Sequence, residues 1–264
     1  MVQDDKMPTK IRILLLGDST LIGSVPREMI PTADTLEEIV RKLLEAEADL
    51  PPVDVVNRGR DGDSIDLLLS RLDEEDAAGQ APFDFIFTRY GLNDICVLQD
   101  FKTEFPANYR KLISRLRVDH PEAEIVLETV IPYVGENPVF TENTHEIINA
   151  QVRAVAAADE LPLLDQYGPY ADELQRGPYM LSYRRLGLAA IPKKYHALIP
   201  PEWIRNEPST GDPVAYMFDN LLDIHLAGIP GWFLNRHPNP AGYQVIGAQL
   251  ADYLAPRLRK RANA

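Results

Sequence analysis

The sequence predicts an α/β fold in which a parallel sheet is covered by helices on both faces. Short apolar runs recur along the first two thirds of the 264-residue chain and are typical of strands buried on both faces. Segments with apolar residues at helical spacing separate these runs. Strands that alternate with helices in this way form βαβ units, which build parallel sheets with right-handed crossovers.

Five segments are predicted as strands because each is a short apolar run next to turn residues. They lie at residues 11–16, 53–56, 83–88, 125–130 and 161–164. Helices are predicted between and after them, at residues 36–44, 65–72, 109–116, 142–158 and 241–254. The first of these helices follows Thr35, which with Glu38 has the pattern of a capping box. The last begins after Pro240 and is expected to end near Pro256.

Residues 176–240 break this alternation. They hold nine of the 22 prolines and both tryptophans, Trp203 and Trp232. Long loops in compact domains are usually functional or disordered, and the aromatic content argues against disorder. We therefore expect one domain over residues 10–258, with an irregular but ordered insertion at 176–233 before the last helix.

Composition excludes several classes of function. With 27 basic and 40 acidic residues the net charge is −13, which disfavours a nucleic-acid partner. The single cysteine excludes an intrachain disulfide and a Cys-rich zinc site, and no spaced His/Asp/Glu set indicates a metal. No apolar run is long enough for a bilayer and the first ten residues lack a signal-peptide pattern, so a cytoplasmic protein is expected. A signal peptide already removed from the given sequence would leave the same N-terminal residues. The sequence does not indicate the oligomeric state.

Polar turns follow the first three predicted strands, at residues 17–20, 57–63 and 90–94, and a fourth polar segment, 237–243, precedes the last helix. In an open parallel sheet ligands bind outside the carboxyl ends of the strands, so these turns are expected to meet at one edge. Each pattern alone is more typical of an ordinary turn or a helix cap. Their joint occurrence in this order is what indicates a site.

Chemical roles follow from the residue types. Ser19, at a strand-to-helix turn, is a candidate nucleophile, and His237 is the candidate base that a serine hydroxyl needs. The backbone amides of Ser19 and Gly62 and the side-chain amide of Asn93 could stabilise an oxyanion. His225, close to Asp223, is a rival base, but it lacks the Pro-Asn-x-x-Gly context that follows His237.

Four blocks of the chain together resemble the SGNH hydrolases, also called the GDSL esterase/lipase family. They are Gly17-Asp18-Ser19, Gly62, Gly91-Leu92-Asn93-Asp94 and His237-Pro238-Asn239. The resemblance implies a flavodoxin-like three-layer α/β/α sandwich with a five-stranded parallel sheet. It also implies catalysis by Ser19 and His237, an oxyanion hole that includes Gly62 and Asn93, cleavage of esters such as acetylated sugars, and no cofactor.

One position departs from the family pattern, which has an aspartate three residues before the histidine. That position is Leu234, whose side chain cannot orient an imidazole. In a serine protease, changing the corresponding aspartate to asparagine lowers turnover about 10⁴-fold. Three interpretations stay open: another carboxylate such as Asp219 or Asp223 replaces it, a backbone carbonyl within 232–234 accepts the histidine N–H, or the enzyme is inactive.

The function predicted is a serine esterase that hydrolyses short-chain acyl esters, such as O-acetyl groups on a carbohydrate or another small alcohol. An acyltransferase and a non-catalytic binding protein are the alternatives. The insertion at 176–233 is expected to cover the site and set substrate choice, because it runs directly into the His237 segment. A cluster of arginines could bind an acidic substrate, or each could pair with a nearby aspartate; these are Arg58, Arg60, Arg89 and Arg236.

Overall fold

Five parallel strands form the central sheet, in the order β2-β1-β3-β4-β5. The computed structural model describes residues 10–23, 25–76, 82–132, 141–176, 181–235 and 237–262. The strands of this sheet are β1 (Ile11–Gly17), β2 (Val53–Asn57), β3 (Phe85–Arg89), β4 (Glu124–Glu128) and β5 (Leu163–Leu164). In register, Ile13 of β1 lies opposite Val55 and Phe85 of its two neighbours. The predicted five-stranded parallel sheet is confirmed.

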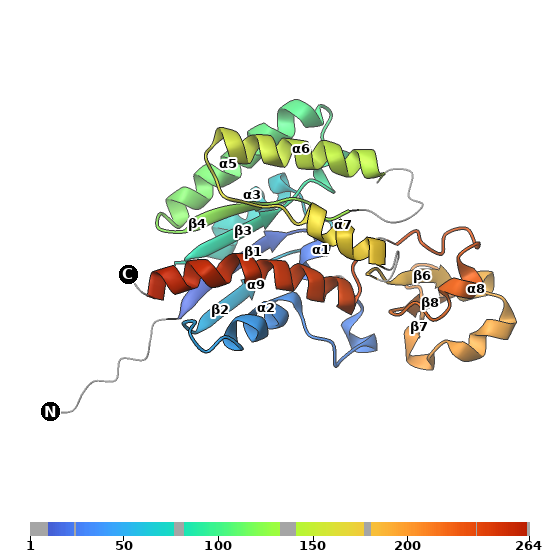
Figure 1. Cartoon of the computed structure of the whole chain (residues 1–264). Coiled ribbons are helices and arrows are strands. Elements are labelled where there is room, and N and C mark those ends of the chain that lie inside the picture. Colours follow the sequence, from blue (N-terminus) through green and yellow to red (C-terminus); the bar gives the residue numbers. More distant parts are fainter. Residues whose placement is uncertain are drawn as a thin grey trace.

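Helices cover both faces of this sheet (Figure 1). The α-helices are α1 (Ser19–Ile22), α2 (Leu36–Glu45), α3 (Ile65–Asp76), α4 (Asp94–Val97), α5 (Phe101–Asp119), α6 (Glu142–Ala158), α7 (Tyr167–Arg176), α8 (Asp223–Leu226) and α9 (Pro240–Ala262). Short 3₁₀ turns are η1 (Arg27–Met29), η2 (Leu188–Ala190), η3 (Lys193–Leu198) and η4 (Pro201–Trp203). α2 and α9 pack together on one face, whereas α3, α5 and α6 lie on the other. The molecule is therefore an α/β/α sandwich, as predicted.

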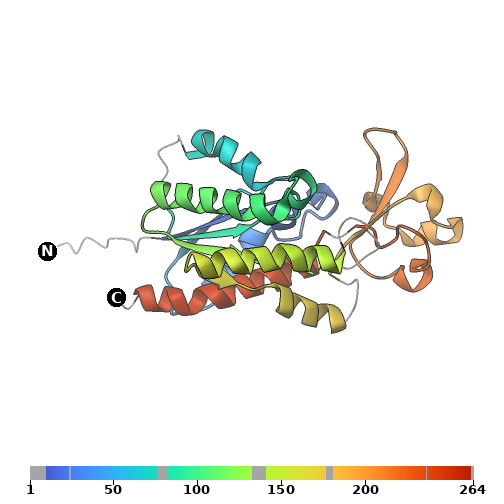
Figure 2. The same ribbon diagram turned by 90° about the horizontal axis from the view of Figure 1, so that it is seen from above.

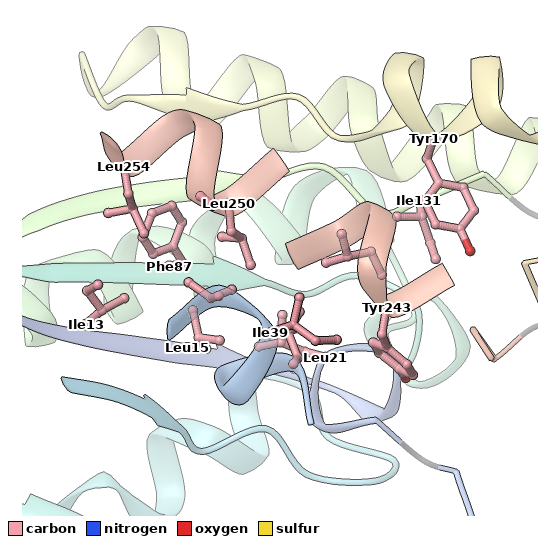
Figure 3. Packing of buried hydrophobic residues seen from close by; sticks show 14 of the residues in the cluster. Ile13, Leu15, Leu21, Ile39, Phe87, Ile131, Tyr170, Tyr243, Leu250 and Leu254 are labelled. Carbon is pink, nitrogen blue, oxygen red and sulfur yellow. The ribbon is translucent and has the colours of Figure 1, made fainter. Parts of the chain in front are cut away.

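Side chains that alternate along the strands fill two hydrophobic cores, one on each face of the sheet. Ile13 and Leu15 belong to the core beneath α2 and α9, whereas Leu14 and Leu16 belong to the core on the opposite face. Figure 3 shows the first core, in which Phe87 of β3 lies near the α9 side chain Leu254. Because all four β1 residues are at most 1% exposed, the strand reads in the sequence as a continuous apolar run.

Two helices contain a proline, Pro106 in α5 and Pro256 in α9, and only Pro256 was expected to lie near a helix end. α5 begins at Phe101, eight residues before its predicted start, and α9 continues through Pro256 to Ala262. A proline inside a helix removes one hydrogen bond and costs about 3 kcal/mol. Burial offsets that cost here, because Phe101 and Phe105 stack in the core at 4.6 Å between ring centroids and Leu258 is fully buried.

The insertion contains a small antiparallel sheet that the sequence analysis did not predict. Its strands are β6 (Arg184–Gly187), β7 (Ile204–Asn206) and β8 (Pro213–Met217), in the order β6-β8-β7. Strands of three to five residues between proline-rich turns are too short to show a period. Trp232 and Met217, both fully buried, belong to a separate core beneath this sheet. We call residues 181–235 the lobe; it lies beyond the end of the large sheet where β1 leads into α1 (Figures 1 and 2).

Candidate active site

Ser19 is the first residue of α1, directly after the turn that ends β1. Asp18 caps this helix, because its side chain accepts the Thr20 backbone N–H at 2.8 Å and the Thr20 hydroxyl at 2.7 Å. A Cβ at Gly17 would lie 2.9 Å from the backbone oxygen of Arg89, so only glycine fits this tight turn. The turn therefore holds Ser19 at the carboxyl edge of the sheet.

His237 meets Ser19 across 218 residues of sequence. Its Nε2 lies 2.9 Å from the serine Oγ. The segment that carries it is fixed on both sides: the Asn239 side chain donates to the Phe218 carbonyl at 3.2 Å and accepts the Gly242 N–H at 3.0 Å. His225, the rival base, instead stacks its ring on Tyr195 at 4.9 Å between centroids.

Asn235 is the residue that the sequence analysis missed. Its Oδ1 lies 3.0 Å from His237 Nδ1 and also accepts the His237 backbone N–H at 2.9 Å. Because that backbone bond fixes Oδ1 as the acceptor, Nδ1 must carry the proton and Nε2 is left to accept from Ser19. The amide also hydrogen-bonds the Tyr183 side chain, whose ring stacks on His237 at 6.1 Å between centroids.

The carboxylates proposed for this role act elsewhere. Asp223 accepts hydrogen bonds from Arg184 and from the Trp232 indole N–H, the latter at 2.8 Å, and Asp219 accepts from the Leu221 backbone N–H at 3.0 Å. The acceptor recorded for Nδ1 is thus neither a carboxylate nor a backbone carbonyl. The acceptor is instead the side-chain amide of the residue next to Leu234, two positions before the histidine.

Gly62 and Asn93 line the same cleft as Ser19 and His237. Gly62 has φ +72°, a left-handed conformation that favours glycine, and a Cβ there would meet nothing within 4 Å. The Asn93 side chain donates to the Asp63 carbonyl at 2.8 Å. Asp63 is held in turn by a buried bidentate pair with Arg71, at 2.6 and 2.7 Å.

Asp94 joins the two loops that carry Gly62 and Asn93. One carboxylate oxygen accepts the Ile65 N–H and the other accepts the Gly91 N–H, both at 3.0 Å. Burial raises the pKa of this carboxyl to about 7, against the opposing effect of these backbone hydrogen bonds. Asp94 therefore positions both loops without itself lining the cleft.

The cleft has a volume of about 820 Å³ and is open to solvent on one side. Among the residues that the main domain contributes are Ser19, Gly62, Asn93 and His237, together with Arg27, Glu28 and Asp61. The lobe contributes Tyr183, Arg185, Arg205, Tyr216 and Asn235. Residues within the predicted insertion thus form one wall of the cleft, while the boundaries 10–258 and 176–233 stay a prediction.

The four arginines singled out in the sequence are not the arginines of this cleft. Arg58 lies over the Phe83 ring, Arg60 is exposed outside the cleft, and Arg89 is fully buried beneath it. Arg236 lies outside the described residues. Three other arginines line the cleft, and two of them come from the small sheet that the sequence did not reveal.

Among the described residues, no group of three or more His, Cys, Asp or Glu side chains is placed to hold a metal ion. No helix in the same part of the chain combines the length and the apolar character needed to cross a bilayer.

Comparison with known proteins gives one matching family and several structures of similar fold. The family described as GDSL-like Lipase/Acylhydrolase matches residues 15–245. No curated protein matches the chain. Solved structures that resemble it include the lipase/acylhydrolase from Enterococcus faecalis, at 18% identity and a TM-score of 0.54, covering 94% of this chain and 96% of that one. Axe2, an acetylxylan esterase from Geobacillus stearothermophilus, is 18% identical with a TM-score of 0.56 and covers 96% of both chains. At these identities the structural likeness shows the fold.

Proposed function

Because the chain belongs to the GDSL-like lipase/acylhydrolase family and is a carboxylic ester hydrolase, we propose that it acts as a serine esterase with Ser19 as nucleophile. Its substrates are short-chain acyl esters, in particular O-acetyl groups on a carbohydrate or another small alcohol. The observation that carries this proposal is the 2.9 Å contact between Ser19 Oγ and His237 Nε2 within a cleft that Gly62 and Asn93 also line.

The proposed reaction proceeds in two halves. Ser19 Oγ attacks the ester carbonyl while its proton passes to His237 Nε2, which gives a tetrahedral intermediate. The Ser19 and Gly62 amides and the Asn93 side chain donate to the oxyanion. Collapse breaks the bond to the alcohol, which leaves with the proton from His237. Water, deprotonated by His237, then attacks the acyl-enzyme, and the carboxylic acid leaves as Ser19 takes the proton back.

The proposed alcohol is a sugar for two reasons. The cleft wall formed by the lobe carries Tyr183 and Tyr216, whose rings are stacked at 6.1 Å between centroids, beside several polar side chains. Tyrosine combines a large apolar ring with a hydroxyl, which suits the mixed surface of a sugar. Axe2, which shares the fold, is an acetylxylan esterase.

The nucleophile can be tested by covalent trapping. A labelled fluorophosphonate followed by peptide mass spectrometry is expected to give one adduct, on Ser19, and none in a Ser19→Ala variant. Hydrolysis of 4-nitrophenyl esters of two to eight carbons is expected to be fastest for the shortest acyl chain. An adduct on another residue, or turnover that survives in Ser19→Ala, would contradict the proposal. A binding protein without catalysis would show neither trapping nor turnover.

Asn235 is expected to orient the base, which a pair of substitutions can test. Asn235→Leu removes the acceptor for Nδ1–H, so we expect kcat to fall about 10²-fold, within the range lost when general-base catalysis fails. Asn235→Asp keeps an acceptor oxygen and adds a charge that stabilises the imidazolium, so kcat should equal or exceed that of the wild type. Steady-state kinetics across pH 5–9 measure both. Equal losses in the two variants would show that Asn235 serves only the local fold.

A further inference from the structure

The small sheet of the lobe presents one face to its own core and the other to the cleft. Residues alternate along a strand, and Ala215 and Met217 of β8 point into the lobe core. Tyr216 between them therefore points the opposite way, into the cleft. In register, Arg185 of β6 lies opposite Tyr216, and Arg205 of β7 lies opposite Val214, two residues from Tyr216 on the same face.

Two cationic side chains therefore flank a tyrosine on the wall that faces Ser19. The Arg185 Nε donates to the Tyr216 hydroxyl at 3.1 Å, and its guanidinium lies 5.9 Å from that ring centroid. Tyr183 links this group to the catalytic centre, because its ring stacks on both Tyr216 and His237. Arg185 also lines a second, smaller cavity of about 210 Å³ together with Leu234, Asn235 and His237.

The charge of the cleft is opposite to that of the chain. Three arginines, Arg27, Arg185 and Arg205, line it against two carboxylates, Glu28 and Asp61, whereas the whole chain carries −13. Fixed positive charge inside a concave site raises the local concentration of anions. An arginine guanidinium presents donors in a planar fork that matches a carboxylate.

Both lobe arginines have acidic neighbours that a substrate can compete with. Arg185 pairs with Glu207, which lies outside the cleft, and Arg205 pairs with Glu28 across it. The arginine side chains are 42% and 39% exposed, and that of Glu28 is 57% exposed. Exposed pairs of this kind contribute little to stability, and each guanidinium keeps further donors for a bound anion.

We propose that Arg185 and Arg205 form a subsite for a negatively charged group on the alcohol part of the ester, so that the preferred substrate is an acylated sugar acid or a similar anionic alcohol. This inference rests on the proposed function. The acyl group is short and lies at Ser19, so the charge belongs to the alcohol, which extends past His237 and Tyr183 toward Arg185.

A matched pair of esters tests the subsite. At neutral pH 4-acetoxybenzoate is an anion, whereas 4-acetoxybenzamide is neutral and has nearly the same shape; the released phenols are followed by absorbance. We expect kcat/KM to be about tenfold higher for the anion, in keeping with the strength of charge-assisted hydrogen bonds. Arg185→Gln and Arg205→Gln should each remove most of this preference, because kcat/KM should fall much more for the anionic ester than for the neutral one.

Two further variants act as controls. Arg110→Gln removes an exposed arginine of α5 that pairs with Asp159 away from the cleft, and it should leave the preference unchanged. Glu28→Gln removes the competing carboxylate, so the preference should rise. Equal effects of the Arg185 and Arg205 substitutions on both esters, or a lower preference in Glu28→Gln, would overturn the subsite.

A binding measurement separates the subsite from the proposed chemistry. In Ser19→Ala, which cannot form an acyl-enzyme, titration calorimetry compares 4-hydroxybenzoate with 4-hydroxybenzamide. Tighter binding of the anion that is lost in Ser19→Ala/Arg185→Gln supports the subsite even if the wild type hydrolyses neither ester. Equal binding of the two compounds overturns the subsite, whatever the fate of the esterase proposal.

Discussion

Replacing His237 with alanine is expected to lower kcat about 10⁴-fold, the upper end of what general-base catalysis contributes. Ser19 Oγ, 2.9 Å from His237 Nε2, would then keep its proton and stay a poor nucleophile. The fold should persist, because the neighbouring pairing depends on backbone groups: the Tyr183 N–H donates to the His237 carbonyl at 3.2 Å. Steady-state hydrolysis of 4-nitrophenyl acetate measures the loss of kcat, and far-ultraviolet circular dichroism checks that the fold is retained.

His225→Ala is the matched control for this result. His225 lies in the lobe, two residues from Asp223, and stacks on Tyr195 away from Ser19. We expect its loss to change kcat less than about threefold, as for a side chain outside the proton path. If His225→Ala lost activity while His237→Ala kept it, the assignment of the base would be wrong.

Replacing Arg89 with methionine is expected to lower the free energy of unfolding by about 3–5 kcal/mol at pH 8, as when one partner of a buried pair is removed. Arg89 is fully buried at the end of β3. It donates to the Thr20 carbonyl at 2.7 Å and to Gln166 at 2.8 Å, and it lies 3.8 Å from Glu128. Among the described atoms neither Glu128 oxygen has a hydrogen-bond partner, so its charge depends on this arginine.

The loss should depend on pH through Glu128. Burial raises the pKa of this carboxyl to about 7, although Arg89 opposes the shift, compared with 4.5 for an unburied glutamate. An acid whose pKa is raised by folding contributes most to stability below its unfolded pKa, and this contribution is lost as pH rises from about 4.5 to about 7. Without Arg89 the charged form is disfavoured further, so the variant should lose less stability at pH 5 than at pH 8.

Chemical unfolding at the two pH values measures this difference. The double variant Arg89→Met/Glu128→Met removes both charges and should recover much of the loss at pH 8, because hydrophobic replacement of a buried pair is often neutral. A loss of equal size at both pH values, with no recovery in the double variant, would locate the effect in packing around Arg89 rather than in the charge of Glu128.

The large sheet could be predicted from sequence because its signal is local. A strand such as β1, buried on both faces, is apolar along its whole length, and the Thr35–Glu38 capping box appears in the structure with hydrogen bonds of 2.7 and 3.2 Å. Ser19, Gly62, Asn93 and His237 could be selected together because each sits beside the end of a regular element. The structure brings all four to one cleft.

The features that the sequence did not reveal depend on tertiary packing. The start of α5 depends on burial of Phe101 and Phe105, which outweighs the cost of Pro106 inside the helix. Asn235 could not be identified because its role depends on the fold of the segment between Trp232 and His237. The Arg185–Tyr216 pair depends on strand register within a sheet whose strands are too short to be detected. Arginines near strand ends were visible in sequence, but spacing alone could not tell Arg89, which is fully buried, from one that faces solvent.

The pairing of Ser182 with Pro238, together with the hydrogen bond from the Tyr183 N–H to the His237 carbonyl, joins the residues just before β6 to the segment before α9. The wall proposed to select the substrate is therefore joined directly to the segment that carries the proposed base. An exchange of loops between related hydrolases would therefore have to move residues 182–183 and 237–238 together. Exchanging only one of the two segments would break the backbone contacts that hold the His237 segment in place.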